Sequence, residues 1–165
     1  MALFNPEEFM QQTVDKPLET EFKLCPAGEY EAAIDDFTAE AIESIDFEYK
    51  RGPKAGQPGQ MVKFSCPFVI NNEGVKAELN REKVVVTKQV ILDMDENGQL
   101  DWGTNKNIEL GRIRQAVGQN VEGPWSIGKL RGAGPVMVKV THRDYTTKDG
   151  RKGTQADIDR VVPIF

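Results

Sequence analysis

Histidine and cysteine are scarce in this chain of 165 residues, which contains one histidine and two cysteines. Cys25 and Cys66 are too few for a disulfide framework and too far apart in sequence for a zinc knuckle. His142 lies on a predicted strand without a local partner, which argues against histidine-based acid–base or nucleophilic catalysis. We therefore expect no catalytic residues, no metal site and no cofactor.

Long hydrophobic runs and the common enzyme motifs are missing as well. The apolar stretches are strand-sized and fall short of the ~18 residues that cross a bilayer. The first residues lack the basic start and apolar stretch of a secretory signal. There is no P-loop and no Gly-x-Ser-x-Gly elbow, and Gly132-Ala133-Gly134 is not followed by the helix that a dinucleotide site needs. These absences indicate a non-enzymatic, cytoplasmic protein without membrane contact.

Charge is distributed very unevenly along the chain. Residues 1–48 carry thirteen acids and two lysines, a net charge of −11, whereas the remaining nineteen cations and thirteen acids give +6 and leave a total of −5. An acidic segment joined to a basic body is typical of proteins that bind anions. The length fits one domain with extensions, because one hydrophobic core needs about 100–150 residues.

The N-terminal segment is predicted to be a short helix followed by an arm. The pattern Asn5-Pro6-Glu7-Glu8 combines an N-cap, a proline at the first helical position and acids at the positive end of the dipole, so we expect a helix over 6–14. Residues 15–26 are polar and interrupted by prolines, which favours an extended arm. We divide the chain into an acidic helix and arm at 1–26 and a β-rich domain at 27–165.

Alternation of polar and apolar residues predicts a body composed mainly of β-strands. One helix, at about 106–117, is predicted to pack against a sheet or barrel while Arg112 and Arg114 project elsewhere. Its apolar stripe comprises Ile108, Leu110, Ile113, Ala116 and Val117. Residues 50–60 form a surface loop rich in glycine, proline and cations. Strands are expected at residues 29–34, 42–49, 61–70, 75–80, 84–92, 136–141 and 158–164, with turns at 71–74, 95–98 and 148–153.

One segment matches most of a calcium-binding loop. Residues 93–101 place oxygen ligands at positions one, three, five and nine, with glycine at position six. The twelfth position is Thr104 instead of a bidentate glutamate, and a predicted strand rather than a helix precedes the loop. A hairpin turn is the better interpretation.

The basic part of the chain gives the strongest indication of a ligand. Seven cations and two acids lie between residues 129 and 152, and a loop at 50–54 adds three cations. Cations bind a phosphate backbone, and exposed aromatic rings stack on unpaired bases at ~1–3 kcal/mol each. The combination favours single-stranded nucleic acid, although exposed strands are commonly rich in cations and Trp125 also suits a core position. The predicted contacts are Lys50, Arg51, Lys54, Trp125, Lys129, Arg131, Lys139, Arg143, Tyr145 and Lys148.

Several framework motifs lie along residues 24–164. They are the opening strand Pro26–Ala32, the strand around Phe64 and Phe68, the helix Leu110–Gly118, and the closing segments Leu130–Gly132 and Val136–Val140. Together they resemble small bacteriophage proteins with an OB-type β-barrel, which include single-stranded DNA-binding proteins. The resemblance implies an OB-like antiparallel barrel or strongly curved sheet that binds single-stranded DNA in replication or recombination. One departure is the position of the acids, which lie at the N-terminus and not in a C-terminal tail.

Two functions are compatible with the sequence. The leading hypothesis is a phage protein that coats single-stranded DNA in the host cytoplasm, associates with itself and contacts other phage proteins through its acidic arm. The alternative is a virion structural protein, such as a capsid decoration or connector subunit, whose first 26 residues lie on a neighbouring chain.

Overall fold

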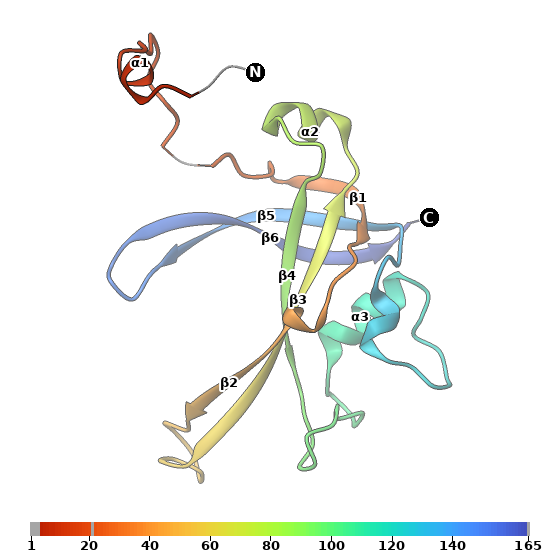
Figure 1. Ribbon diagram of the computed structural model, residues 1–165. Helices are drawn as coiled ribbons and strands as arrows, with labels where there is room; N and C mark the ends of the chain where they lie inside the picture. The colour runs from red at the N-terminus through yellow and green to blue at the C-terminus, as the bar shows by residue number, and fades with distance from the viewer. Residues whose placement is uncertain (1–3, 21, 165) are drawn as a thin grey trace.

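The computed structural model describes residues 4–20 and 22–164. Its six strands form one antiparallel sheet (Figure 1), so the prediction of a mainly β protein is confirmed. The elements are α1 Pro6–Met10, β1 Gly28–Ile34, η1 Ala39–Ala41, β2 Ile42–Glu48, β3 Pro58–Ile70, α2 Glu73–Leu79, β4 Val85–Leu92, α3 Ile108–Ala116, η2 Ile127–Leu130, β5 Val136–Thr146 and β6 Lys152–Pro163.

The sheet curls around its core but is not closed. The strand order is β2-β3-β1-β5-β6, and β4 pairs with the other edge of β3. β4 and β6 lie close to each other without a ladder of backbone hydrogen bonds between them. Lys88 reaches across this opening and donates a hydrogen bond from its Nζ to the carbonyl oxygen of Ile158 at 3.2 Å. A closed barrel is therefore not observed.

The core lies on the concave face of the sheet and beneath α3. On β3, Phe64, Cys66, Phe68 and Ile70 are buried, and the residues between them are not, as the two-residue period of a strand requires. β4 and β5 show the same alternation, and α3 covers the space between β4 and β6. Burial of these side chains stabilises the fold by roughly 25 cal/mol per Å² of apolar surface removed from water.

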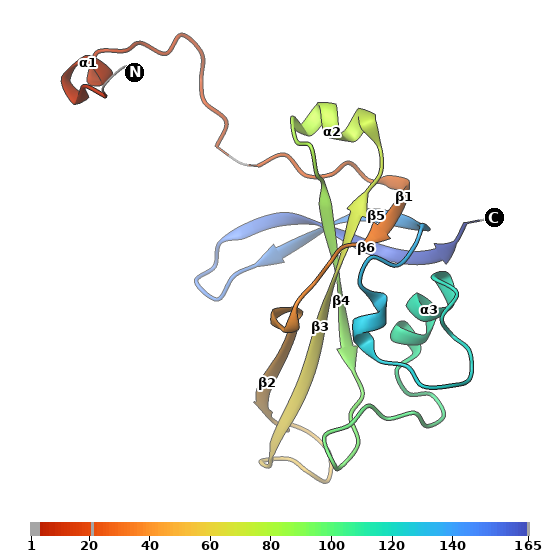
Figure 2. The ribbon, with the colours of Figure 1, turned by 45° about the vertical axis from the view of Figure 1, so that its right-hand side comes forward.

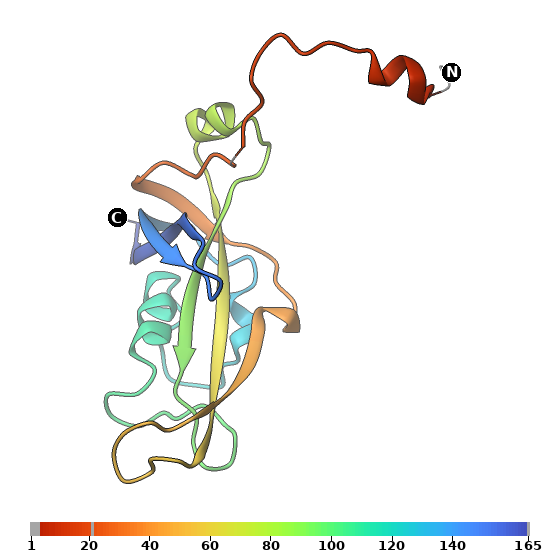
Figure 3. The ribbon, with the colours of Figure 1, turned by 90° about the vertical axis from the view of Figure 1, so that its left-hand side faces the viewer.

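The N-terminal helix is shorter than predicted, and it stands away from the body. The side-chain oxygen of Asn5 accepts hydrogen bonds from the backbone N–H groups of Glu7 and Glu8 at 3.0 and 3.4 Å, as expected for an N-cap. α1 ends at Met10 rather than at residue 14, because none of its residues is buried and so short a helix gains little without packing. Figures 1 to 3 show α1 and the following arm projecting from the domain.

Two further predictions are wrong, one about a strand and one about which side chains of α3 are buried. A strand was predicted at residues 75–80, but residues 75–79 belong to α2. The Asn72 side chain accepts a hydrogen bond from the backbone N–H of Val75 at 3.0 Å, and Asn80 ends the helix in a left-handed conformation. α3 forms where expected, but Ile108 is 51% exposed and Arg114 is buried. The capping of α2 acts locally and outweighs the alternation that suggested a strand.

Two pairs of strands extend beyond the core as two-stranded ribbons (Figure 1). The first ribbon consists of β2, the first half of β3 and the loop between them, residues 42–63; the second ribbon is the outer part of the β5–β6 hairpin, residues 141–157. No residue of β2 is buried, and the outer half of β5 is exposed. An isolated two-stranded ribbon is marginally stable in water, so each ribbon depends on the sheet from which it extends.

No helix in the described part of the chain is long and apolar enough to cross a membrane.

Candidate nucleic-acid interface

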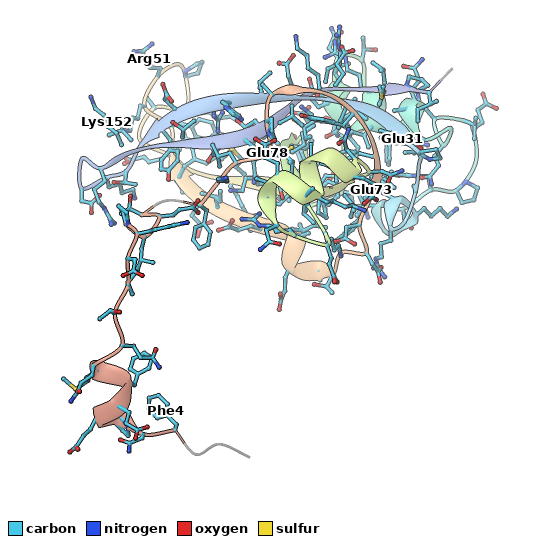
Figure 4. All side chains as sticks on the ribbon, turned by 90° about the horizontal axis from the view of Figure 1, so that it is seen from above. Phe4, Glu31, Arg51, Glu73, Glu78 and Lys152 are labelled. Carbon is cyan, nitrogen blue, oxygen red and sulfur yellow. The ribbon has the colours of Figure 1, made fainter. Side chains whose placement is uncertain are left out.

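The structure distributes the predicted contact residues over three regions. Lys50, Arg51 and Lys54 lie in the loop at the tip of the first ribbon. Lys139, Arg143, Tyr145 and Lys148 belong to β5 and the tip of the second ribbon. Trp125, Lys129 and Arg131 lie at and beside η2, near α3 and away from the ribbons. In the view from above, Arg51 and Lys152 mark the two ribbons on the side opposite to Glu31 (Figure 4).

The first ribbon carries an aromatic pair beside its basic loop. The ring centroids of Phe47 and Tyr49 are 4.9 Å apart, and both rings lie over Gly59. A Cβ atom at position 59 would be 2.6 Å from Phe47 Cζ and 2.7 Å from Tyr49 Cε2, so only glycine leaves room for them. The Nζ of Lys54 lies 5.7 Å from the centroid of the Tyr49 ring. This aromatic pair was missed in the sequence, because only the strand register places Phe47 opposite Gly59.

The second ribbon repeats the same construction. Tyr145 is paired with Gly153, and a Cβ atom at position 153 would lie 2.5 Å from Tyr145 Cζ, so the exposed ring lies flat across the ribbon. Lys148, Arg151 and Lys152 cluster at the adjacent tip. Each ribbon therefore presents an aromatic ring over a cross-strand glycine, next to a basic turn.

Asp149 stabilises the turn of the second ribbon. Its carboxylate accepts a hydrogen bond from the Thr147 hydroxyl and pairs with the Arg151 Nε at 2.9 Å. The hydrogen bond from Thr147 lowers the pKa of Asp149 below its usual value. The carboxylate is thus held in its charged form and neutralises part of the charge of Arg151, which leaves Lys148 and Lys152 as the main cations of this tip.

The outer face of β3 and β4 joins the two ribbons. Residues that alternate with the core positions point to this face, and Lys63, Ser65, Gln89 and Ile91 lie on it as cross-strand neighbours. Ser65 Oγ donates a hydrogen bond to Gln89 Oε1 at 2.8 Å. Lys63 pairs with Glu43 at 3.7 Å, which places it on the same face as the aromatic pair.

A hollow of about 370 Å³ continues this outer face toward the second ribbon. It is lined by Gln89 of β4 together with Arg143 and Asp157 of the ribbon. The Arg143 Nε pairs with Asp157 Oδ2 at 3.0 Å, so the charge of Arg143 is partly neutralised. The first ribbon, the outer face of β3 and β4, this hollow and the second ribbon form one continuous surface.

The remaining predicted contacts lie off this surface. Trp125 is half-buried: its indole N–H donates a hydrogen bond to Gln119 Oε1 at 2.8 Å, and the Arg114 guanidinium lies 4.3 Å from its ring centroid. Lys129 donates a hydrogen bond to the carbonyl oxygen of Pro124 at 2.9 Å. Lys139 is paired in the sheet with Glu29 on one side and Arg160 on the other, away from both tips. Arg131 follows η2, and its guanidinium carbon lies 5.6 Å from the centroid of the Phe37 ring. The geometry thus favours the ribbon residues over these four.

The two cysteines are buried, and the calcium-like loop is a turn. Burial raises the pKa of the Cys66 thiol to about 12, so this thiol is protonated at physiological pH. Asp95 Oδ1 accepts hydrogen bonds from the backbone N–H groups of Asn97 and Gln99 at 2.8 and 2.9 Å, as in a turn. Across residues 4–20 and 22–164, no cluster of three or more acidic, cysteine or histidine side chains is placed to hold a metal ion.

No protein-family model matches the chain, and searches of curated proteins and of solved structures also found no match.

Proposed function

We propose that this protein binds single-stranded nucleic acid, DNA in the first instance, along the surface from the tip of the first ribbon to the tip of the second. The observation that carries the proposal is the shared construction of the ribbons, in which Phe47 with Tyr49, and Tyr145, lie over glycines beside basic turns. Lysine and arginine side chains bind phosphates without regard to sequence. Flat exposed rings stack on bases, at ~1–3 kcal/mol per base.

The connectivity supports an OB-like architecture that is open between β4 and β6. In OB-folds, oligonucleotides bind to the face of the second and third strands and to the loops between strands one and two and between strands four and five. When β1 and β2 are taken together as the first strand, β3 and β4 become the second and third, and the two ribbon loops fall at these two positions. The proposed path follows the same face and the same loops.

The proposed role is that of a non-enzymatic coat for exposed single strands, in phage replication or recombination. A single strand is favoured over a duplex because the bases must be unpaired to stack on the rings. Binding by lysine and arginine releases counterions from the nucleic acid, so the affinity should fall steeply with salt.

The deciding experiment is a fluorescence anisotropy titration of a labelled single-stranded DNA oligonucleotide and of its duplex, at low and at near-physiological salt. Salt-sensitive binding that favours the single strand is the expected result. Absence of binding at low salt, or preference for the duplex, contradicts the proposal. An RNA oligonucleotide of the same sequence, titrated in parallel, establishes which nucleic acid is preferred.

The exposed arm favours a second candidate function, that of a virion structural subunit. Large apolar side chains of the arm, including Met10, Val14 and Leu18, are exposed, which suits a segment that lies on a neighbouring chain in a particle. Mass spectrometry of purified virions tests this function, because a replication protein should be absent from them. Protease protection of the arm in particles, but not in the isolated protein, would be the matching structural result.

A further inference from the structure

Arg114 of α3 lies in a corner formed by two tryptophan rings. Its guanidinium carbon is 4.3 Å from the centroid of Trp125 and 5.7 Å from the centroid of Trp102. The two indoles are nearly perpendicular, at 86°, with centroids 6.3 Å apart. Trp102 belongs to the loop between β4 and α3 and is 61% exposed, so the corner opens to solvent at this ring.

The charge of Arg114 is incompletely compensated within the chain. The residue is only 9% exposed, its Nε–H has no hydrogen-bond partner, and its Nη2 donates a hydrogen bond to the carbonyl oxygen of Gln119 at 3.0 Å. Among the described residues, no carboxylate forms an ion pair with it. Contact with two indoles offsets part of the cost of burying a cation. The positive charge of Arg114 that is left uncompensated attracts an anionic group to the surface next to Trp102.

The loop that carries Trp102 is held in place on both sides of this residue. The buried Asn107 side-chain amide donates hydrogen bonds to the carbonyl oxygens of Asp93 and Asp101, each at 2.9 Å, and its oxygen accepts one from the backbone N–H of Asp93 at 2.8 Å. The exposed indole is thus preorganised. A suitable ligand carries an apolar ring to pack on Trp102 and a carboxylate to approach Arg114.

The N-terminal segment of the same protein, which consists of Phe4, Asn5 and α1, has this chemistry. The rings of Phe4 and Phe9 contact each other with centroids 5.4 Å apart and are 73% and 56% exposed. Glu7 and Glu8 lie between them, and no residue of α1 is buried. Figure 4 shows Phe4 far from the body of the domain.

We propose that Phe4 and α1 of one copy bind the Trp102–Arg114–Trp125 corner of a second copy. The phenylalanine rings pack against Trp102, and the carboxylates of Glu7 and Glu8 complement the charge of Arg114. A second copy is the partner because α1 and α3 lie on opposite sides of the molecule in Figures 1 and 3. Residues 11–25 span up to about 50 Å when extended, enough to reach a neighbour.

Sedimentation velocity of the full-length protein without nucleic acid tests this contact, over a range of protein concentrations. Wild-type protein should associate as its concentration rises. Trp102→Ala removes the exposed ring of the corner. The double variant Phe4→Ala, Phe9→Ala removes the two rings of the N-terminal segment. Each variant should weaken association at least about tenfold. An equimolar mixture of the two variants should associate again, because Trp102→Ala supplies an intact N-terminal segment and the double variant supplies an intact corner.

Val121→Ala is the matched control, since it removes an exposed apolar side chain from the neighbouring loop. It should associate like the wild type, and circular dichroism should show that each variant is folded. A monomeric wild type, unchanged association of folded Trp102→Ala, or a mixture that stays monomeric overturns the proposal. The double variant Lys148→Ala, Lys152→Ala provides a further test. If it loses association and Trp102→Ala does not, the proposal is overturned, because the N-terminal segment would then bind the second ribbon. The measurement contains no oligonucleotide, so its outcome is separate from that of the DNA titration.

Discussion

Tyr145 and Gly153 act as one unit on the second ribbon, because the glycine is what allows the ring to lie flat. Replacing the ring tests its role in binding. We expect Tyr145→Ala to weaken binding of single-stranded DNA by about 1–3 kcal/mol, which is roughly 5- to 150-fold in Kd. Val121→Ala, which removes an exposed side chain away from the ribbons, should leave the anisotropy titration unchanged. Equal losses in both variants would refute the assignment of the ribbons.

Gly59 tests the first ribbon without removing an aromatic ring. A side chain at this position collides with both Phe47 and Tyr49, so Gly59→Val should displace the pair from the ribbon surface. The core is untouched, and we therefore expect a loss of DNA affinity with little change in the thermal unfolding midpoint. Anisotropy and calorimetry on the same preparation check the two parts. Affinity equal to that of the wild type would show that the ring pair is not used.

Asp35 connects a surface ion pair to the pH dependence of stability. Lys83 donates a hydrogen bond to Asp35 and pairs with it at 2.8 Å, which lowers the pKa of this carboxyl below its usual value. Because the folded-state pKa is the lower one, the contribution to stability is present above about pH 4 and is lost as the pH falls through the folded value. Lys83→Ala should make the free energy of unfolding less dependent on pH in this range. Urea unfolding between pH 2 and pH 6 measures this dependence. An unchanged curve would contradict the pairing.

Among the helices, α3 contains a glycine that the packing does not require. Gly111 has open space around its Cα and lies in the interior of the helix. We expect Gly111→Ala to stabilise the protein by about 0.5–1 kcal/mol, because alanine loses less backbone entropy in a helix. Chemical denaturation measures this change, and a destabilised variant would show that the Cβ meets a neighbour that moves.

The charge asymmetry of the whole molecule predicts the effect of removing its N-terminal segment. Residues 4–20 contain four acids and one lysine, and none of them is buried. Deletion of residues 2–20 should leave the unfolding midpoint unchanged and should raise the affinity at low salt for a single-stranded DNA oligonucleotide that holds one copy, because the net negative charge of this segment no longer repels the nucleic acid. The gain should disappear at high salt, where screening is strong. A lower midpoint would show that the arm packs on its own domain.

Much of the fold follows from local patterns in the sequence. The alternation in residues 61–70 and 84–92 places one face of β3 and β4 in the core, and the N-cap at Asn5 begins α1 as expected. α2 was missed because Asn72 and Asn80 act as helix caps, which an apparent turn and returning strand concealed. The burial of Arg114 was missed because its partners, Trp102 and Trp125, lie on separate loops.

The amino-acid sequence by itself determined the mainly β character, the acidic N-terminal segment and the basic turns, because strand alternation and charge are properties of neighbouring residues. Only the tertiary structure decided which aromatic rings are available. Strand register places Phe47 with Tyr49 over Gly59 and Tyr145 over Gly153, whereas Trp125 is covered by Arg114 from another element. These contacts join residues that are far apart in the chain, and their geometry depends on how the whole sheet curls.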